Sequence, residues 1–400
     1  MATDKQHKIP NAPNLRFPEF EGEWKESLLQ DVATLSKGAG ISKEQLSKEG
    51  NPCILYGELY TKYNSEVITE IYSRTNIDLK NLVLSKKNDV IIPSSGETAI
   101  DISTARCVPF DNIFLGGDLN IIRLNGHDGR FLSYQLNGVR RLDIAKVAQG
   151  VSVVHLYGEN LRRLKVRFPR KEEQEKIAAF MTVIDARIQT QIGAIEAIES
   201  LIKGITIEVS RSNNVKQMYL KDLLMERTER NAGHHEVYSV SVSEGVVNQV
   251  EYLGRSFAAA DTSQYNVARY GDIIYTKSPT GCFPYGIVKR SAITKPVAVS
   301  PLYGVFQPIN DNISIYLHQY FCSVINAHNY LHKLIQKGAK NTINITNQRF
   351  LENTVPIPDK ETQEKYVKVI DVLVRKLKIE KCLLESYRQQ KFFLLKNMFV

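Results

Sequence analysis

Apolar residues recur at steps of three and four between residues 168 and 205, which predicts one long helix. The repeated positions are Ile177, Met181, Ile184, Ile188, Ile192, Ile195, Ile198, Ile202 and Ile205. They form a single narrow seam, the pattern of a coiled coil. At about 1.5 Å per residue such a helix would be about 60 Å long. Because an isolated helix with so narrow a seam is unstable, it needs a partner helix.

A second stretch with the same pattern, residues 357–398, supplies that partner. Its apolar positions are Tyr366, Ile370, Leu373, Leu377, Leu384, Tyr387, Leu394 and Met398. Glu380 and Lys391 interrupt the heptad frame. We therefore expect the two helices to pack together antiparallel as a coiled coil.

The segments before the two helices share one plan. Short apolar runs alternate with turn signals, which predicts strands joined by loops, and a helical run follows at 131–147 and again at 315–335. Matched features recur at an offset of roughly 190 residues, as for Leu29 with Leu220 and Pro169 with Pro358. A fixed offset over several features indicates an internal duplication.

These patterns predict an α+β fold with two mixed α/β globules, two long helices and a pseudo-two-fold internal duplication. The first globule is expected at 1–168 and its helix at 169–208. The second globule is expected at 209–356 and its helix at 357–400. Two globules held apart by helices could contact two half-sites on DNA, because the spacing of half-sites is set by helical turns.

Charge and cysteine usage narrow the setting of the protein. The 400 residues carry a formal charge of +9, which suggests a polyanionic partner, although part of this charge lies on the second helix. The five cysteines form no C-x-x-C pair, so neither a disulfide framework nor a zinc site is indicated. Without an apolar leader or membrane-length segment, a cytoplasmic location is expected.

Motifs that would indicate catalysis are missing from the sequence. There is no Asp/Asn-Pro-Pro-aromatic loop to hold a target adenine, no phosphate-binding G-x-x-x-x-G-K-[S/T], no H-E-x-x-H and no G-x-S-x-G. His234 and His235 stand without companion ligands, and we expect them to be structural or solvated. No catalytic or metal-binding residue is therefore predicted.

Several segments resemble one known family. They are Leu15-Arg16-Phe17-Pro18-Glu19-Phe20 followed by Trp24, the strand at 271–274, and Pro169 with Glu173-Gln174 before the first long helix. Together they are similar to the specificity (S) subunit of type I restriction–modification enzymes over about residues 15–398. The second copy departs from the pattern, because Thr362 replaces glutamate before Gln363 and no counterpart of Trp24 is present.

The resemblance implies two target-recognition domains, each reading one half of a split, asymmetric site in double-stranded DNA. It further implies that the helices dock two modification subunits, which methylate adenine with S-adenosylmethionine. Restriction subunits, ATP-dependent nucleases and translocases, would join through them. Cofactors (S-adenosylmethionine, ATP and Mg²⁺) are expected on the partner subunits only.

Candidate contact residues follow from loop position and side-chain chemistry. Polar and basic side chains in loops after strands suit base edges and phosphates, although each alone could equally be a solvated turn residue. The candidates for DNA are Lys62, Ser94, Ser95, Arg106, Ser152, Ser241, Lys277, Ser278, Lys340 and Asn341. By the resemblance, partner docking is expected on an outward face at the helix starts, carrying Glu173, Gln174 and Gln363.

Two neighbouring features and two other functions stay open. Tyr56, Tyr60 and Tyr63 are better suited to packing than to stacking on DNA. The basic cluster at 162–171 could hold phosphates, dock an acidic partner or simply be surface. The main alternative function is a stand-alone bipartite DNA-binding or architectural protein; a self-sufficient enzyme is disfavoured by the missing motifs.

Overall fold

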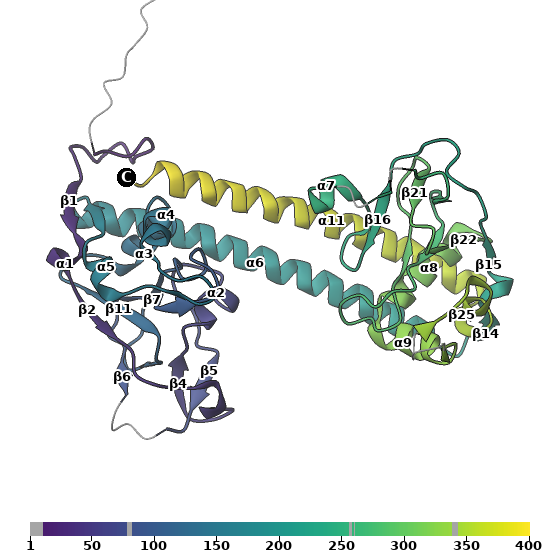
Figure 1. Ribbon diagram of the computed structural model, residues 1–400, viewed down its shortest axis with the longest axis horizontal. Coiled ribbons are helices and arrows are strands. Elements are labelled where there is room, and N and C mark those ends of the chain that lie inside the picture. The colour runs from purple at the N-terminus through teal and green to yellow at the C-terminus, as the bar shows by residue number, and fades with distance from the viewer. Residues whose placement is uncertain (1–10, 78–81, 256–257, 260, 338–342) are drawn as a thin grey trace, which may run out of the picture. The chain divides into compact units, whose positions relative to one another are not determined.

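The computed structural model describes residues 11–77, 82–255, 258–259, 261–337 and 343–400, which form two units (Figure 1). The first unit comprises Met1–Ile192 and Cys382–Val400, and the second comprises Gly193–Lys381. The two long helices are α6 (Lys171–Ser210) and α11 (Lys360–Asn397). Each unit therefore contains one globule and a part of both helices.

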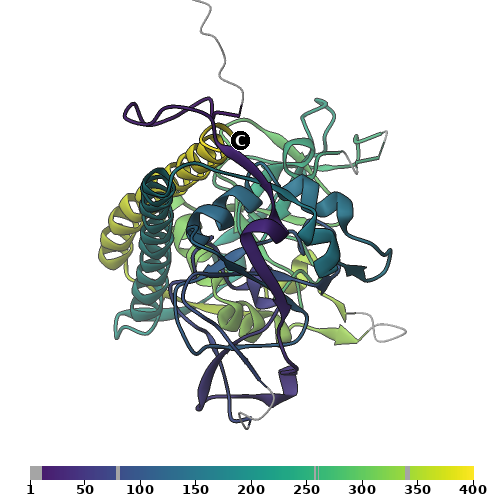
Figure 2. The same ribbon diagram turned by 90° about the vertical axis from the view of Figure 1, so that its left-hand side faces the viewer.

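Within each unit the two long helices lie side by side and run antiparallel (Figures 1 and 2). In the first unit Lys391 bonds Asp185, and the guanidinium of Arg187 lies 5.1 Å from the centre of the Tyr387 ring. In the second unit the hydroxyl oxygens of Thr206 and Tyr366 are 2.8 Å apart. Rising residue numbers on one helix meet falling numbers on the other, which confirms the antiparallel coiled coil.

The predicted seam of α6 faces this contact and the adjoining globules. Ile177 and Met181 are fully buried, whereas Ile192 and Ile205 are partly exposed. On α11 the positions Leu373 and Leu377 are only partly buried. The seam thus packs most densely where a globule covers the helix pair.

The first globule is closed by pairing between its two ends. Strand β1 (Lys25–Leu28) runs antiparallel to β13 (Lys165–Phe168), directly before α6. The main antiparallel sheet has the order β2-β11-β7-β9, with bounds Ala33–Lys37, Leu119–Leu124, Asp89–Pro93 and Arg106–Val108. Helix α3 (Gly129–Asn137) packs on β7 and β9 and is followed by α4 (Arg141–Val147).

A smaller sheet extends the first globule away from the helices (Figure 1). Its order is β3-β5-β4-β10-β6, with bounds Leu46–Ser47, Ser73–Thr75, Asn51–Ile54, Phe114–Leu115 and Val83–Leu84. The remaining elements are α1 (Leu29–Val32), η1 (Lys43–Gln45), α2 (Glu58–Thr61), β8 (Ser95–Gly96), β12 (Val154–His155) and α5 (Gly158–Arg162). Strands β8 and β12 pair with each other.

The second globule repeats this plan. Strand β14 (Val215–Tyr219) pairs antiparallel with β25 (Thr354–Pro358), directly before α11. The sheet order β15-β22-β19-β20 has bounds Leu224–Glu226, Gly304–Pro308, Ile273–Tyr275 and Val288–Arg290. Helices α8 (Asp311–Cys322) and α9 (Val324–His332) stand where α3 and α4 stand in the first globule.

Other elements of the second globule have no close match in the first. They are η3 (Leu220–Asp222), the hairpin β16 (Tyr238–Ser241) with β17 (Gly245–Asn248), α7 (Gln249–Leu253), the pair β18 (Asn266–Ala268) with β21 (Val297–Val299), the pair β23 (Gln336–Lys337) with β24 (Ile343–Asn344), and α10 (Asn347–Phe350). The family plan thus fixes the sheet and its helices and leaves the connecting segments variable.

One turn shows the duplication at atomic detail. Asp89 and Asp272 stand at equivalent strand starts, and each accepts a hydrogen bond from the backbone N–H three residues earlier. Each also binds an arginine through both carboxylate oxygens, Arg123 in the first globule and Arg227 in the second. The residue before each aspartate has φ above +80°, which only glycine or a residue such as asparagine adopts readily. The predicted internal duplication is confirmed.

The two helical runs predicted at 131–147 and 315–335 are each broken into two helices. Gly138 ends α3, where a Cβ atom would lie 3.0 Å from the Leu395 carbonyl oxygen. Ser323 ends α8 in an extended conformation, and its hydroxyl accepts a hydrogen bond from Asn326 N–H at the start of α9. In the described part of the chain, no helix has the length and apolar character that crossing a bilayer requires.

Candidate nucleic-acid interface

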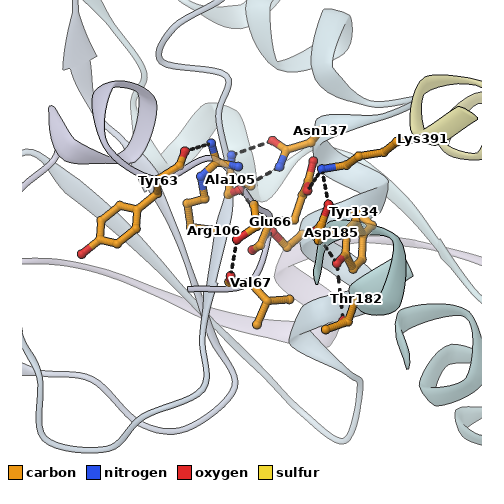
Figure 3. Close-up of polar contacts among 12 residues, drawn as sticks. Tyr63, Glu66, Val67, Ala105, Arg106, Tyr134, Asn137, Thr182, Asp185 and Lys391 are labelled. Carbon is orange, nitrogen blue, oxygen red and sulfur yellow. Dashed lines mark hydrogen bonds and ion pairs between the residues drawn. The ribbon is translucent and has the colours of Figure 1, made fainter. Parts of the chain in front are cut away.

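The candidate DNA contacts of the first globule divide into exposed and buried residues. Lys62 and Ser152 are exposed, and Lys62 bonds Glu58 at 2.6 Å from the end of α2. Ser94 and Ser95 are buried beside β7 and β12. Arg106 is buried too, and its guanidinium donates to the carbonyl oxygens of Leu59 and Tyr63 at 3.0 and 2.7 Å (Figure 3). In this conformation Ser94, Ser95 and Arg106 have no surface to offer a DNA groove.

Residues near Lys62 offer more accessible chemistry that the sequence reading missed. Its ammonium lies 3.4 Å from the Ser73 hydroxyl on β5. Tyr72 and Arg74 flank Ser73 and are both exposed, so an aromatic ring and a guanidinium face solvent here. The only sequence signal was alternation around a buried serine. Tyr63 packs in the core, as expected for that tyrosine.

In the second globule the best-formed candidate is the loop after β19. Lys277 has φ of +62°, and Gly281 and Gly286 also have positive φ, so the backbone turns tightly. Thr280 and Phe283 exchange two backbone hydrogen bonds of 3.0 Å, which closes the tip of the loop. A non-glycine residue in this conformation costs free energy, and such residues concentrate at functional sites.

The loop presents polar groups at its exposed tip. Ser278 is exposed, and Lys277 is half-buried, with burial lowering the pKa of its ammonium. Ser241 lies at the end of β16, where its hydroxyl is 3.1 Å from that of Tyr252. The remaining candidates, Lys340 and Asn341, lie outside the described residues.

The expectation that Glu173 and Gln174 face outward is wrong, because both are 1% exposed. Glu173 binds the Arg16 guanidinium through both carboxylate oxygens at 2.8 and 2.7 Å and accepts from Trp24 Nε1 at 3.3 Å. This contact explains why Thr362 and the missing tryptophan occur together in the second copy. Arg16, Trp24 and Glu173 form one structural unit that the first globule alone uses.

The glutamines of the motif have a duplicated structural role. The Gln174 side-chain amide donates to the Pro169 carbonyl oxygen at 2.8 Å, and Gln363 donates to the Pro358 carbonyl oxygen at 2.7 Å. Each glutamine thereby fixes the turn that connects a closing strand to a long helix. Gln363 is partly exposed, so it alone of the three docking candidates presents surface.

The interruption of the seam at Lys391 is part of a buried charged cluster in the first unit (Figure 3). Lys391 bonds Glu66 from the globule and Asp185 of α6, the latter at 2.6 Å. The Tyr134 hydroxyl donates to the other Asp185 oxygen at 2.7 Å. Burial and the neighbouring Glu66 carboxylate raise the pKa of Asp185 to about 6. The cluster joins globule, α6 and α11.

Other polar features are neutralised or lack ligand geometry. In the basic cluster, Lys165 and Arg167 both pair with Glu26, and Arg162 pairs with Glu159. Over the ranges that the structure describes, no three His, Cys, Asp or Glu side chains converge as metal ligands.

Apolar side chains are exposed on the long helices in the second unit. On α11 Val372 and Ile379 are 60% and 66% exposed, and their seven-residue spacing places them on one face. Val369 lies one turn from Val372, and Leu201 of α6 is half exposed. Exposed apolar side chains that share a helix face are typical of interaction surfaces.

Known proteins with similar sequences and folds agree on one family. The family model for the type I restriction modification DNA specificity domain matches residues 21–200 and again 224–386. A Haemophilus influenzae protein assigned as a type I restriction enzyme specificity subunit is 22% identical over 200 residues. That match covers 49% of this chain and 46% of the relative, so the chain spans about half of that protein's length.

Two solved structures share the fold over nearly the whole chain. The S subunit of a type I restriction–modification system from M. genitalium has a TM-score of 0.63 and 18% identity, and 97% of this chain and 99% of that chain are covered. A chain from a type I restriction–modification complex has a TM-score of 0.52 and 12% identity, with coverages of 94% and 97%. At these identities the likeness concerns the fold.

Proposed function

The chain belongs to the type I restriction modification DNA specificity family, and we propose that its two globules read the two halves of a split, asymmetric DNA site. Each globule acts as a target-recognition domain. The long helices dock two adenine-methyltransferase subunits, and restriction subunits join through these partners. The chain itself acts as the recognition subunit.

The observation that carries this proposal is the combination of a shared scaffold with different surface loops. Both globules have the same four-strand order and the same aspartate turn. After the equivalent strands β7 and β19, however, one loop buries Ser94 and Ser95 while the other exposes Ser278. Loops of different chemistry on one scaffold suit two different base sequences, because direct readout depends on which donors and acceptors reach the groove.

Docking of the methyltransferase is supported by the exposed apolar face of α11 described above. Apolar side chains at Val372 and Ile379 would be buried by a partner helix packing on α11. This placement replaces the outward face that was expected to carry Glu173 and Gln174. S-adenosylmethionine, ATP and Mg²⁺ belong to the partner subunits in this proposal.

Adenine-methylation mapping tests the recognition function. The full chain is co-expressed with the methyltransferase encoded beside its gene, and methylated adenines are located across the genome of the host. We expect one split motif, with different sequences in its halves and an adenine methylated in each. If a stable complex with an active methyltransferase gives no methylated motif, the protein is a stand-alone bipartite DNA binder and the proposal fails.

A further inference from the structure

The thiol of Cys322 contacts a buried lysine in the second unit. Cys322 is the last residue of α8, and Lys289 lies on the edge strand β20. The Lys289 side chain is 5% exposed as a residue, and its Nζ is 3.4 Å from the Cys322 Sγ. A buried ammonium is costly unless an anion or acceptor compensates it. Within the described part of the chain, the Cys322 sulfur is the hydrogen-bond partner of this ammonium.

A histidine one turn earlier on α8 directs a second donor to the same sulfur. The Nδ1 atom of His318 accepts a hydrogen bond from the Arg290 backbone N–H at 3.2 Å. That nitrogen therefore carries no proton, so the ring proton is on Nε2. The Nε2 atom faces Cys322 Sγ at 4.0 Å. Lysine supplies a positive charge, and a neutral imidazole supplies a donor.

These contacts oppose two effects that favour the neutral thiol. Burial raises the pKa of the Cys322 thiol, and carbonyl groups at the end of a helix disfavour an anion. The contacts with His318 and Lys289 outweigh them and lower the pKa to about 6. Tyr366 of α11 is the further titratable neighbour; burial raises the pKa of its phenol, whose oxygen is 2.8 Å from Thr206, so it stays neutral.

From this geometry we propose that Cys322 is a nucleophilic thiolate site that reacts with hydroperoxides. The thiolate sulfur attacks one peroxide oxygen, the S–O bond forms as the O–O bond breaks, and the leaving alkoxide takes a proton from water. Sulfur is oxidised to a sulfenic acid by two electrons, and the peroxide is reduced to an alcohol or water. The thiolate, and not the thiol, is the reactive species.

Oxidation would act on the second recognition domain. A neutral sulfenic acid no longer compensates the Lys289 ammonium, so the contact between β20 and α8 weakens. The other cysteines lack this environment. Cys53 and Cys107 are buried and burial raises their pKa values to about 11 and 12, while Cys282 and Cys382 are exposed.

Peptide-resolved alkylation of the full chain tests the proposal, with Cys282 and Cys382 as internal controls. Iodoacetamide rates are measured at pH 6.5 and 8.5 by mass spectrometry. Cys322 should slow less than about twofold at the lower pH, whereas thiols with a pKa near 8.5 slow by about fifty-fold. A Cys322 rate that falls as steeply as the controls, or that stays at zero at both pH values, overturns the proposal.

Two variants and a peroxide experiment separate the cause from simple exposure. Lys289→Met removes the ammonium and should restore the steep pH dependence at Cys322, while Lys333→Met at an exposed lysine should not. If Lys289→Met fails to fold by circular dichroism, the wild-type profile alone decides. With hydrogen peroxide and dimedone, the sulfenic-acid adduct should form first at Cys322; equal or earlier labelling at Cys282 contradicts the inference.

Discussion

At the scale of single residues, Glu173 holds the N-terminal segment against the start of α6. Replacing it with Gln removes the charge that pairs with Arg16, which is 14% exposed. We expect Glu173→Gln to lower the free energy of unfolding by about 3 kcal/mol, as for other broken buried ion pairs. Glu361→Gln is the matched control, because the Glu361–Lys365 pair is solvated and its loss should leave the urea midpoint unchanged. Equal midpoints for both variants would contradict the structural role of Glu173.

Lys277 is the residue on which a DNA contact can be tested without changing the backbone. Asparagine tolerates positive φ, so Lys277→Asn removes the charge and keeps the +62° conformation. If Lys277 contacts a phosphate, affinity should fall and the slope of log K against log salt should decrease by about one. Lys221→Asn, an exposed lysine outside the loop, is the control. The measurement is DNA binding by the assembled complex at several salt concentrations; an unchanged slope removes Lys277 from the interface.

Individual contact residues could be predicted from sequence only in part. Ser94, Ser95 and Arg106 have the chemistry of groove contacts, but strand pairing and the carbonyl oxygens of Leu59 and Tyr63 use that chemistry inside the fold. Glu173 likewise carries the strongest motif and yet is buried by segments distant in sequence. Residue type and loop position identify polar groups, whereas their partners depend on tertiary packing.

At the scale of elements, the Lys391 cluster couples α11 to the first globule and to α6. Lys391→Met leaves the carboxylates of Glu66 and Asp185 without their ammonium, so both pKa values should rise above the unfolded values. A raised folded pKa adds stability at low pH that is lost as pH rises through it. We expect a loss of about 3 kcal/mol at pH 8 and a clearly smaller loss at pH 5. Lys396→Met, an exposed control, should show neither loss in denaturant titrations at the two pH values.

The exposed face of α11 should be needed for partner docking and not for folding. Val372→Glu with Ile379→Glu places charge where an apolar contact is proposed, and both side chains are at least 60% exposed. We expect the double variant to keep the wild-type melting temperature and to lose copurification with the methyltransferase. Lys376→Glu, which changes charge one turn from Val372, tests whether electrostatics alone accounts for the loss. Retained complex in the double variant would move the docking surface elsewhere.

Elements were the level at which sequence predicted most. The long helices followed from the seam, because an unbroken 3.6-residue period over forty residues has few other structural meanings. The breaks at Gly138 and Ser323 were missed, because apolar spacing continues through both and close approach of Leu395 is a tertiary effect. Lys391 was seen as an interruption, but its two carboxylate partners lie 206 and 325 residues away and carry no sequence signal.

At the scale of the whole molecule, each globule is inserted into the chain at a paired pair of strands. Lys25 is paired with Phe168 in β1 and β13, and Val215 is paired with Pro358 in β14 and β25. The ends of each globule are therefore neighbours, which is the geometry that tolerates replacement of an inserted domain. Sequence predicted this plan through the duplicated order of features.

Exchange of one globule is the prediction that follows from this plan. Residues 29–164 are replaced by the corresponding segment of another family member that keeps counterparts of Glu66, Phe131 and Tyr134, so the contacts to Lys391, Trp24 and Asp185 persist. We expect methylation mapping to show a new sequence in one half of the motif and the original sequence in the other. The reciprocal exchange of residues 220–353 should change only the other half. Because the two globules share a scaffold and differ in their loops, a chimera that alters both halves would show that recognition depends on the two domains jointly.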